Sequence, residues 1–97
     1  MIRIMTADEM ACTTITVDGK LAGEGIETVE NCCREALKRK KPVCLHLRDV
    51  VAIDERGRSM LQNLVAYGVD LRANGIYSSY IVDQIQLAGL KNRRVAR

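Results

Sequence analysis

Apolar and polar positions alternate in the first part of the chain with the period of two that is typical of β-strands. Residues 2–5 (IRIM) and 12–19 (CTTITVDG) are short segments of this kind, and both are rich in β-branched residues. The segment between them and the pair Asp18-Gly19 contain residues that favour turns. The pattern therefore predicts two strands that open the fold as a hairpin.

The next segment, residues 26–37, has apolar positions with the period of an α-helix. From Ile26 to Leu37 apolar residues recur every three or four positions, and the opposite face carries Glu, Arg and Lys side chains. The basic run 38–41 (KRKK) suits the C-terminus of a helix, and Pro42 prevents the helix from continuing. Residues 26–37 are therefore predicted to form an amphipathic helix on a core. The basic run has a structural explanation that needs no nucleic acid.

The second half of the chain alternates strand-like and helix-like segments. Residues 43–47 (VCLHL) predict a central strand. A second apolar stripe predicts a helix from about residue 56 to Ala73, where Asn74-Gly75 stop it. Residues 76–79 (IYSS) predict a weak strand, and residues 81–90 predict a short closing helix.

The predicted order of elements is thus β-β-α-β-α-β-α. Strands that alternate with helices lie parallel and are joined by right-handed crossovers, while the first strand can pair in the antiparallel direction. We expect an α/β fold with a mixed, mostly parallel four-stranded sheet and helices mainly on one face. A chain of 97 residues builds one core, so we expect a single domain over residues 1–90.

Composition and charge narrow the class of partner. The last seven residues, 91–97 (KNRRVAR), hold four of the 15 Lys and Arg residues and no acidic residue. Residues 1–90 hold 11 Lys and Arg against 12 Asp and Glu, so the net charge of +3 comes from the last seven residues. We expect them to form a disordered basic tail. Three Tyr and no Phe or Trp leave few rings to stack on bases, so nucleic acid is not an expected partner. The sequence shows no signal peptide and no membrane-length apolar run, which predicts a cytoplasmic protein without a membrane partner.

Chemistry-bearing residues are sparse. The four cysteines lack C-x-x-C spacing, so free thiols are expected. Cys12, Cys44 and His46 could meet a metal ion if their strands came together, but small buried thiols and a histidine at a strand end are the simpler interpretation. No nucleophile with a nearby base and no paired carboxylates stand out. We expect no catalytic residue, cofactor or metal.

The turn AIDERGRSML (52–61) carries more charge than its position requires. Asp54 lies directly before a predicted helix, so its side chain can accept hydrogen bonds from the unpaired backbone N–H groups of the first helical turn. Such a cap contributes about 1 kcal/mol to stability. Gly57 would let the helix start lie close to the sheet. These roles do not explain Glu55 and Arg56, two large charged groups on an exposed rim.

The order of elements and this turn resemble the STAS family, the small domains of bacterial anti-sigma-factor antagonists, stressosome proteins and the cytoplasmic ends of sulfate transporters. The resemblance covers about residues 12–90 and rests on ITVDGKLAGEGIETVENCCREAL (15–37) and PVCLHLRDVVAIDERGRSML (42–61). The positions that match the family pattern are Gly19, Leu21, Leu47, Val50, Ile53, Asp54, Gly57 and Leu61.

The resemblance implies a function and a departure from it. In the family's antagonists a Ser or Thr just before the glycine is phosphorylated by the partner anti-sigma kinase, which ejects the antagonist from the complex. This sequence has Arg56 there and Glu55 at the preceding serine, so the resemblance implies that this phosphorylation switch is lost. Ser59 is the nearest hydroxyl, but we do not expect it to substitute, because hydroxyls in a first helical turn usually bond the backbone.

The resemblance further implies a protein partner, of the anti-sigma kinase type, that docks on the loop and helix start. The expected partner-binding residues are Asp54, Glu55, Arg56, Gly57 and Arg58. Two alternatives stay open. Arg56 and Arg58 at a helix N-terminus could hold a nucleotide or another anion. The domain could also be a structural homodimer through a sheet face that bears Thr14, Thr16, Cys44 and His46, a face that we expect to be half apolar and without charge.

Overall fold

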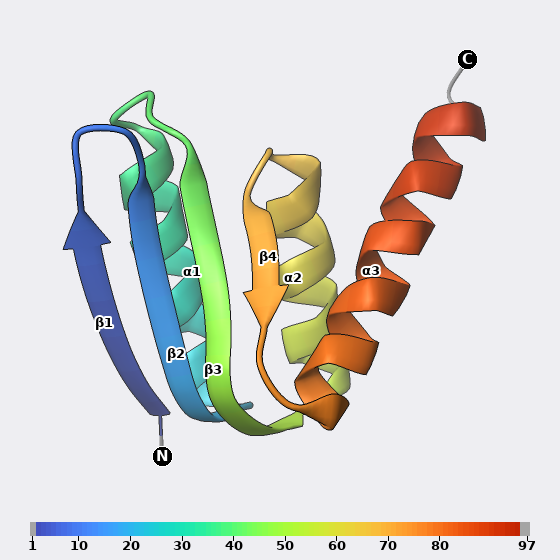
Figure 1. Ribbon diagram of the computed structural model, residues 1–97. Coiled ribbons are helices and arrows are strands. Elements are labelled where there is room, and N and C mark those ends of the chain that lie inside the picture. Colours follow the sequence, from blue (N-terminus) through green and yellow to red (C-terminus); the bar gives the residue numbers. More distant parts are fainter. Residues whose placement is uncertain (1, 96–97) are drawn as a thin grey trace.

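The computed structural model describes residues 2–95, and the side chains of residues 2–87. Four strands and three helices follow one another along this part of the chain (Figure 1). Their bounds are β1 (Ile2–Asp8), β2 (Thr13–Leu21), α1 (Glu24–Leu37), β3 (Val43–Ile53), α2 (Glu55–Ala66), β4 (Asp70–Ala73) and α3 (Ile76–Val95).

The strands form one sheet in the order β1-β2-β3-β4. Strand β1 pairs with β2 in the antiparallel direction, and β2, β3 and β4 are parallel. Helices α1 and α2 lie behind the sheet, and α3 packs at its β4 end, as Figure 1 shows. The α/β class with a mixed four-stranded sheet is therefore confirmed.

Side chains of the strands alternate between a buried face and an open face. On the face toward the helices, the β2 and β3 side chains are fully buried and join the helices in one aliphatic core. Its largest fully buried members are Ile15, Leu21, Leu45, Leu47, Leu61, Leu64 and Ile85. On the other face, the β2 and β3 side chains Thr14, Thr16, Cys44 and His46 are half-buried, and no described helix covers them.

Strands β2 and β3 are longer than the apolar pattern predicts. Strand β3 continues to Ile53 instead of ending at Leu47, because β2 also extends to Leu21 and the two strands pair along their whole length. The Asp18-Gly19 pair is not a turn. It lies at shifts in the β2–β3 register, where Gly19 adopts a φ of 105°. A positive φ at a β-bulge is a conformation that glycine adopts without strain.

The predicted helix 56–73 is present but ends earlier than predicted, and the predicted strand 76–79 is wrong. Helix α2 ends at Ala66, and Gly68 follows with a φ of 100°. The Val69 N–H donates to the Leu64 carbonyl at 3.0 Å and closes the helix end. The last part of the predicted helix is strand β4, and residues 76–79 begin α3.

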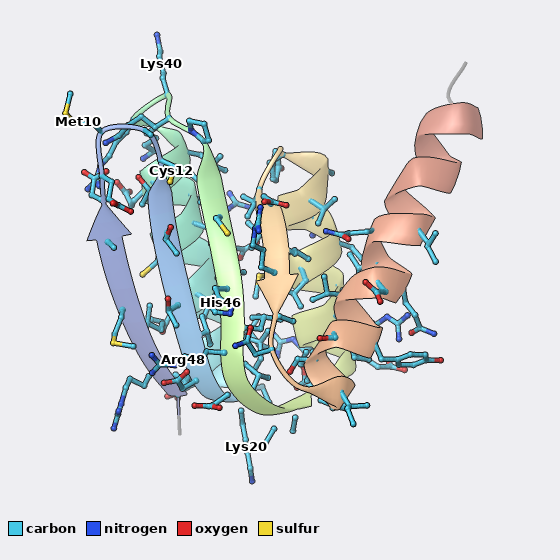
Figure 2. All side chains as sticks on the ribbon, viewed as in Figure 1. Met10, Cys12, Lys20, Lys40, His46 and Arg48 are labelled. Atoms are coloured by element: carbon cyan, nitrogen blue, oxygen red, sulfur yellow. The ribbon has the colours of Figure 1, made fainter. Side chains whose placement is uncertain are left out.

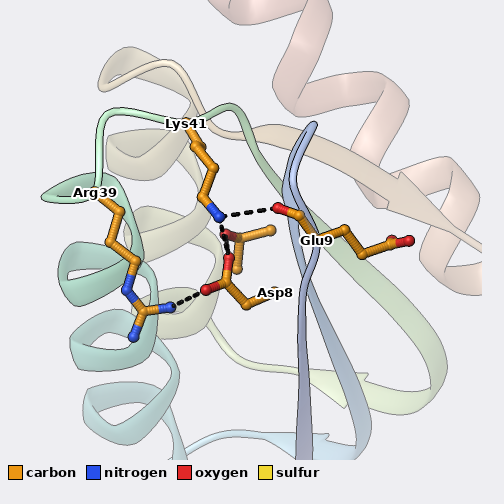
Figure 3. Close-up of polar contacts among 5 residues, drawn as sticks. Asp8, Glu9, Arg39 and Lys41 are labelled. Carbon is orange, nitrogen blue, oxygen red and sulfur yellow. Dashed lines mark hydrogen bonds and ion pairs between the residues drawn. The ribbon is translucent and has the colours of Figure 1, made fainter.

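Two of the four basic residues after α1 bind an aspartate at the end of β1. The Asp8 carboxylate lies between Arg39 and Lys41, at 3.1 Å from Arg39 Nη1 and 2.5 Å from Lys41 Nζ (Figure 3). The buried Thr13 hydroxyl also donates to Asp8 at 2.9 Å. The Lys41 hydrogen bond, more than any other contact, lowers the pKa of Asp8 below its ordinary value of 3.8. This cluster ties the β1–β2 connection to the end of α1.

Helix α3 extends through Val95, so residues 91–95 belong to a helix, whereas residues 96–97 lie outside the described part. The proposed boundary between a domain that ends at residue 90 and a disordered tail at 91–97 stays a prediction. Among the described residues, no helix has the length and apolar character needed to cross a membrane.

Candidate functional site

The charged turn lies at the carboxyl end of β3, next to the end of β2. Asp54 is the N-cap of α2, and its Oδ1 accepts from the Gly57 N–H at 2.7 Å. The Asp54 N–H donates to the Leu21 carbonyl of β2 at 3.3 Å. The backbone of the turn is thus held from both sides, and the predicted capping role of Asp54 is seen in the structure.

Gly57 is buried because α2 starts almost in contact with β2. A Cβ atom built on Gly57 would lie 2.6 Å from the Leu21 carbonyl oxygen, closer than real Cβ atoms approach other heavy atoms. It would also lie 3.3 Å from Asp54 Oδ1. The position accepts only glycine without a shift of backbone, as the sequence led us to expect.

Glu55 and Arg56 are exposed at the start of α2, and among the described residues neither side chain has a hydrogen bond or an ion pair. Arg58 differs from them. It is half-buried, and its Nη2 donates to Gln84 Oε1 of α3 at 2.8 Å. Of the three charged residues, two are therefore free to contact a partner, and Arg58 joins the two helices.

Ser59 is exposed one position further along α2. Within the described part of the chain its hydroxyl makes no hydrogen bond to the helix backbone, in contrast to our reason for excluding it as a substitute phosphosite. The exclusion itself stays a prediction.

The first turn of α3 supports the end of β3, a role that the sequence did not reveal. The Tyr77 hydroxyl accepts from the Ile53 N–H at 3.0 Å, and the buried Ser78 hydroxyl donates to the Val50 carbonyl at 3.0 Å. Strand β2 pairs with β3 as far as Ile53, but β4 pairs with it only as far as Leu47, so these side chains bond to β3 backbone groups in the region that β4 does not cover. The sequence pattern hid this role because residues 76–79 were predicted to be a strand.

The open face of the sheet carries charge, so the expectation that it lacks charge is wrong. Arg48 binds Asp18 through two contacts, Nε to Oδ1 at 3.1 Å and Nη2 to Oδ2 at 2.5 Å. Arg72 Nε binds Asp70 Oδ2 at 3.1 Å. Figure 2 shows the sheet from this side, with His46 near its middle. The Arg48 contact lowers the pKa of Asp18.

All four cysteines are free thiols, as predicted. Cys33 lies in the core, and its burial raises the pKa of the thiol to about 12, which disfavours the reactive thiolate. Burial also raises the pKa of Cys44. Between residues 2 and 87, no three His, Cys, Asp or Glu side chains are close enough to hold a metal ion.

A four-stranded mixed sheet with its helices on one side, and a capped Asp-x-x-Gly turn after the third strand, define a small α/β domain. A solved structure described as an anti-sigma factor antagonist from Mycobacterium paratuberculosis has this fold, with a TM-score of 0.73 and 17% sequence identity. The likeness covers 96% of this chain and 82% of the other. The STAS-like fold is therefore shown.

Two further solved structures are similar over a smaller region. Both are described as Mglu, one of them in its native form, with TM-scores of 0.59 and 0.54 and identities of 22% and 20%. They match 74% and 71% of this chain, which spans only 19% and 22% of theirs. No family model and no curated protein matches the sequence.

Proposed function

We propose that this protein is a non-enzymatic, cytoplasmic regulatory domain of the anti-sigma-antagonist type, which binds a protein partner through residues 53–61 and lacks the serine phosphorylation switch. The proposal is supported by the fold, which is similar to that of an anti-sigma factor antagonist. The observation that carries it is the contrast within residues 54–58. Asp54 and Gly57 are fixed by the backbone, whereas Glu55 and Arg56 are exposed and unpaired among the described residues.

A rigid turn with two free charged side chains is well suited to docking. The ordering cost of association falls when the backbone of a binding loop is already held in place. Glu55 and Arg56 can each meet an opposite charge on the partner, and Arg can bind a carboxylate through two hydrogen bonds. Arg56 has no hydroxyl group, so a kinase partner cannot phosphorylate this position.

The anion-site alternative is less well supported. The Asp54 carboxylate already occupies the first turn of α2, and Glu55 adds a second negative charge there. Arg58, the second cation of that hypothesis, is bound to Gln84. An anion would have to compete with two carboxylates for a helix end whose N–H groups are partly used.

Affinity capture tests the proposal. The wild-type chain and a Glu55→Arg, Arg56→Glu variant are used as bait in an extract of the source cells. A Glu27→Arg, Lys40→Glu variant is the matched control, because these two exposed side chains also have no ion pair among the described residues. We expect the wild type and the control to retain a kinase-like or sigma-pathway protein that the 55/56 variant loses. Retention of the same proteins by all three baits would contradict the docking role, and phosphate on Ser59 of the bait would contradict the loss of the switch.

A further inference from the structure

The open face of the sheet is hollowed where β2, β3 and β4 lie side by side. The cavity has a volume of about 750 Å³, within the range of small-molecule sites. Its walls include Thr14, Pro42, Cys44, His46, Arg72 and Asn74. We call this cavity the sheet-face hollow. It does not include residues 54–58, so an inference about it is independent of the proposed docking function.

Hydrogen-bond donors converge on the hollow from three strands. Among the described residues Asp70 holds Arg72 through Nε alone, which leaves the two terminal NH₂ groups of the guanidinium for another partner. Cys44 of β3 also lines the hollow. Thr14 is the direct register partner of Cys44 on β2 and adds a hydroxyl. The Arg72 guanidinium on β4 and the Thr14 hydroxyl on β2 thus lie on strands that flank β3.

The Arg72–Asp70 pair is accessible to a competing anion. The two side chains are 71% and 55% exposed, and exposed ion pairs are worth little. A ligand carboxylate or phosphate can therefore bind the free side of the guanidinium without first breaking a strong contact. The charge-assisted hydrogen bonds that it gains are about twice as strong as neutral ones.

A histidine and an amide complete the polar wall. His46 Nε2 lies 2.8 Å from Asn74 Oδ1. When His46 donates this hydrogen bond, the Asn74 carbonyl oxygen is occupied and its NH₂ group is left to donate to a ligand. His46 is also the register partner of Arg72, so this pair lies directly beside the guanidinium.

The other end of the hollow is less polar. Pro42 and Cys12 lie there, at the starts of β3 and β2. The strand from Pro42 to His46 spans roughly 13 Å, which accommodates a molecule with an anionic group at one end and an apolar body at the other. We propose that the sheet-face hollow binds a small organic anion, with its carboxylate or phosphate on Arg72 and its apolar part against Pro42.

Amide chemical shifts of the full ¹⁵N-labelled chain test the proposal, with benzoate and phenyl phosphate as probes. Benzamide has nearly the shape of benzoate without its charge and is the control. We expect saturable shifts at residues 12–14, 42–46 and 70–74, with benzamide bound about tenfold more weakly. Arg72→Gln should weaken benzoate about tenfold, and Thr14→Val should weaken it less. Arg34→Gln, which removes an exposed arginine from α1, should leave binding unchanged.

Other outcomes would overturn the proposal. They are benzoate shifts no larger than those of benzamide, binding that Arg72→Gln leaves intact, or a concentration-dependent dimer that covers these residues while the probes have no effect. The Glu55→Arg, Arg56→Glu variant should bind benzoate like the wild type. Failure of partner docking and failure of ligand binding are thereby distinguishable.

Discussion

Replacement of Gly57 by alanine should destabilise the domain, although alanine is the better helix former. The new Cβ would lie 2.6 Å from the Leu21 carbonyl oxygen, so the start of α2 or the end of β2 must move by several tenths of an ångström. That oxygen cannot move freely, because it also accepts from the Asp54 N–H. The close packing between the two elements is therefore what the substitution tests.

The expected change in the free energy of unfolding for Gly57→Ala is the sum of three contributions. Overpacking costs about 1–3 kcal/mol, and a weakened Asp54 cap costs up to about 1 kcal/mol more. The higher helix propensity of alanine offsets about 1 kcal/mol. We expect Gly57→Ala to lower the free energy of unfolding by about 2 kcal/mol, which lowers the Tm of a domain of this size by roughly 8–16 °C.

Urea denaturation measures the free energy directly, and Gly25→Ala is the matched control. Gly25 also lies in the first turn of a helix, but the three atoms nearest to its new Cβ all belong to the Ile2 side chain, the nearest at 3.1 Å, rather than to the backbone. We expect this control to lie within about 0.5 kcal/mol of the wild type. A Gly57→Ala variant as stable as the wild type would refute the argument that α2 is held against β2 at this point.

Three further results are expected. Asp54→Ala should cost about 1 kcal/mol of stability, and Asp54→Asn, which keeps an acceptor for the Gly57 N–H, should cost much less. The folded-state pKa of Asp8 is lowered, chiefly by Lys41, so its contribution to stability is present above pH 3.8 and is lost as the pH falls through the lower, folded value. Asp8→Asn should therefore flatten the acid limb of Tm against pH. Burial raises the pKa of Cys33 to about 12, so a thiol-specific disulfide reagent at about pH 8 should label Cys33 only in denaturant.

Each of these expectations can fail in a defined way. Equal urea midpoints for the Ala and Asn variants of Asp54 would show that the side chain does not act as a cap. An unchanged acid limb in Asp8→Asn would mean that its contacts with Arg39 and Lys41 are not made in solution. Labelling of Cys33 in the native protein, located by peptide mass spectrometry, would contradict its place in the core.

The type and order of the elements in the first half of the chain could be predicted because each segment there has a single period, although the ends of β2 and β3 and the role of Asp18-Gly19 could not. The stripe from Ile26 to Leu37 fits only a helix, and Pro42 marks the start of a new element. The turn at Asp54 and Gly57 could also be predicted, since a cap residue and a glycine at this spacing have a direct structural meaning.

The second half could not be predicted because its periods overlap. The segment 64–71 fits two patterns. The helical stripe continues through Leu64, Gly68 and Leu71, and the period of two of a strand fits Val69 and Leu71. The helix ends before Gly68, whose backbone has a positive φ, and the sequence alone does not reveal this conformation. Tyr77, at the start of α3, looked like a strand residue until its hydroxyl was seen to bond the end of β3.

The hydrogen-bond partner of Arg58 also lay beyond prediction. From its position one turn into α2, it was expected to face a partner together with Glu55 and Arg56. Its contact with Gln84 depends on how α3 crosses α2, which is a property of tertiary packing and has no local signal. Glu55 and Arg56 are therefore the residues that test the docking proposal most directly, and a role of Arg58 in docking stays a prediction.

Hydrogen–deuterium exchange of this protein, alone and in complex with the partner that the wild-type bait retains, tests the central claim most directly. The account predicts that binding slows amide exchange over residues 53–61 and leaves the open face of the sheet unchanged. Protection confined to the sheet face, or to α1, with residues 53–61 exchanging as in the free protein, would contradict it.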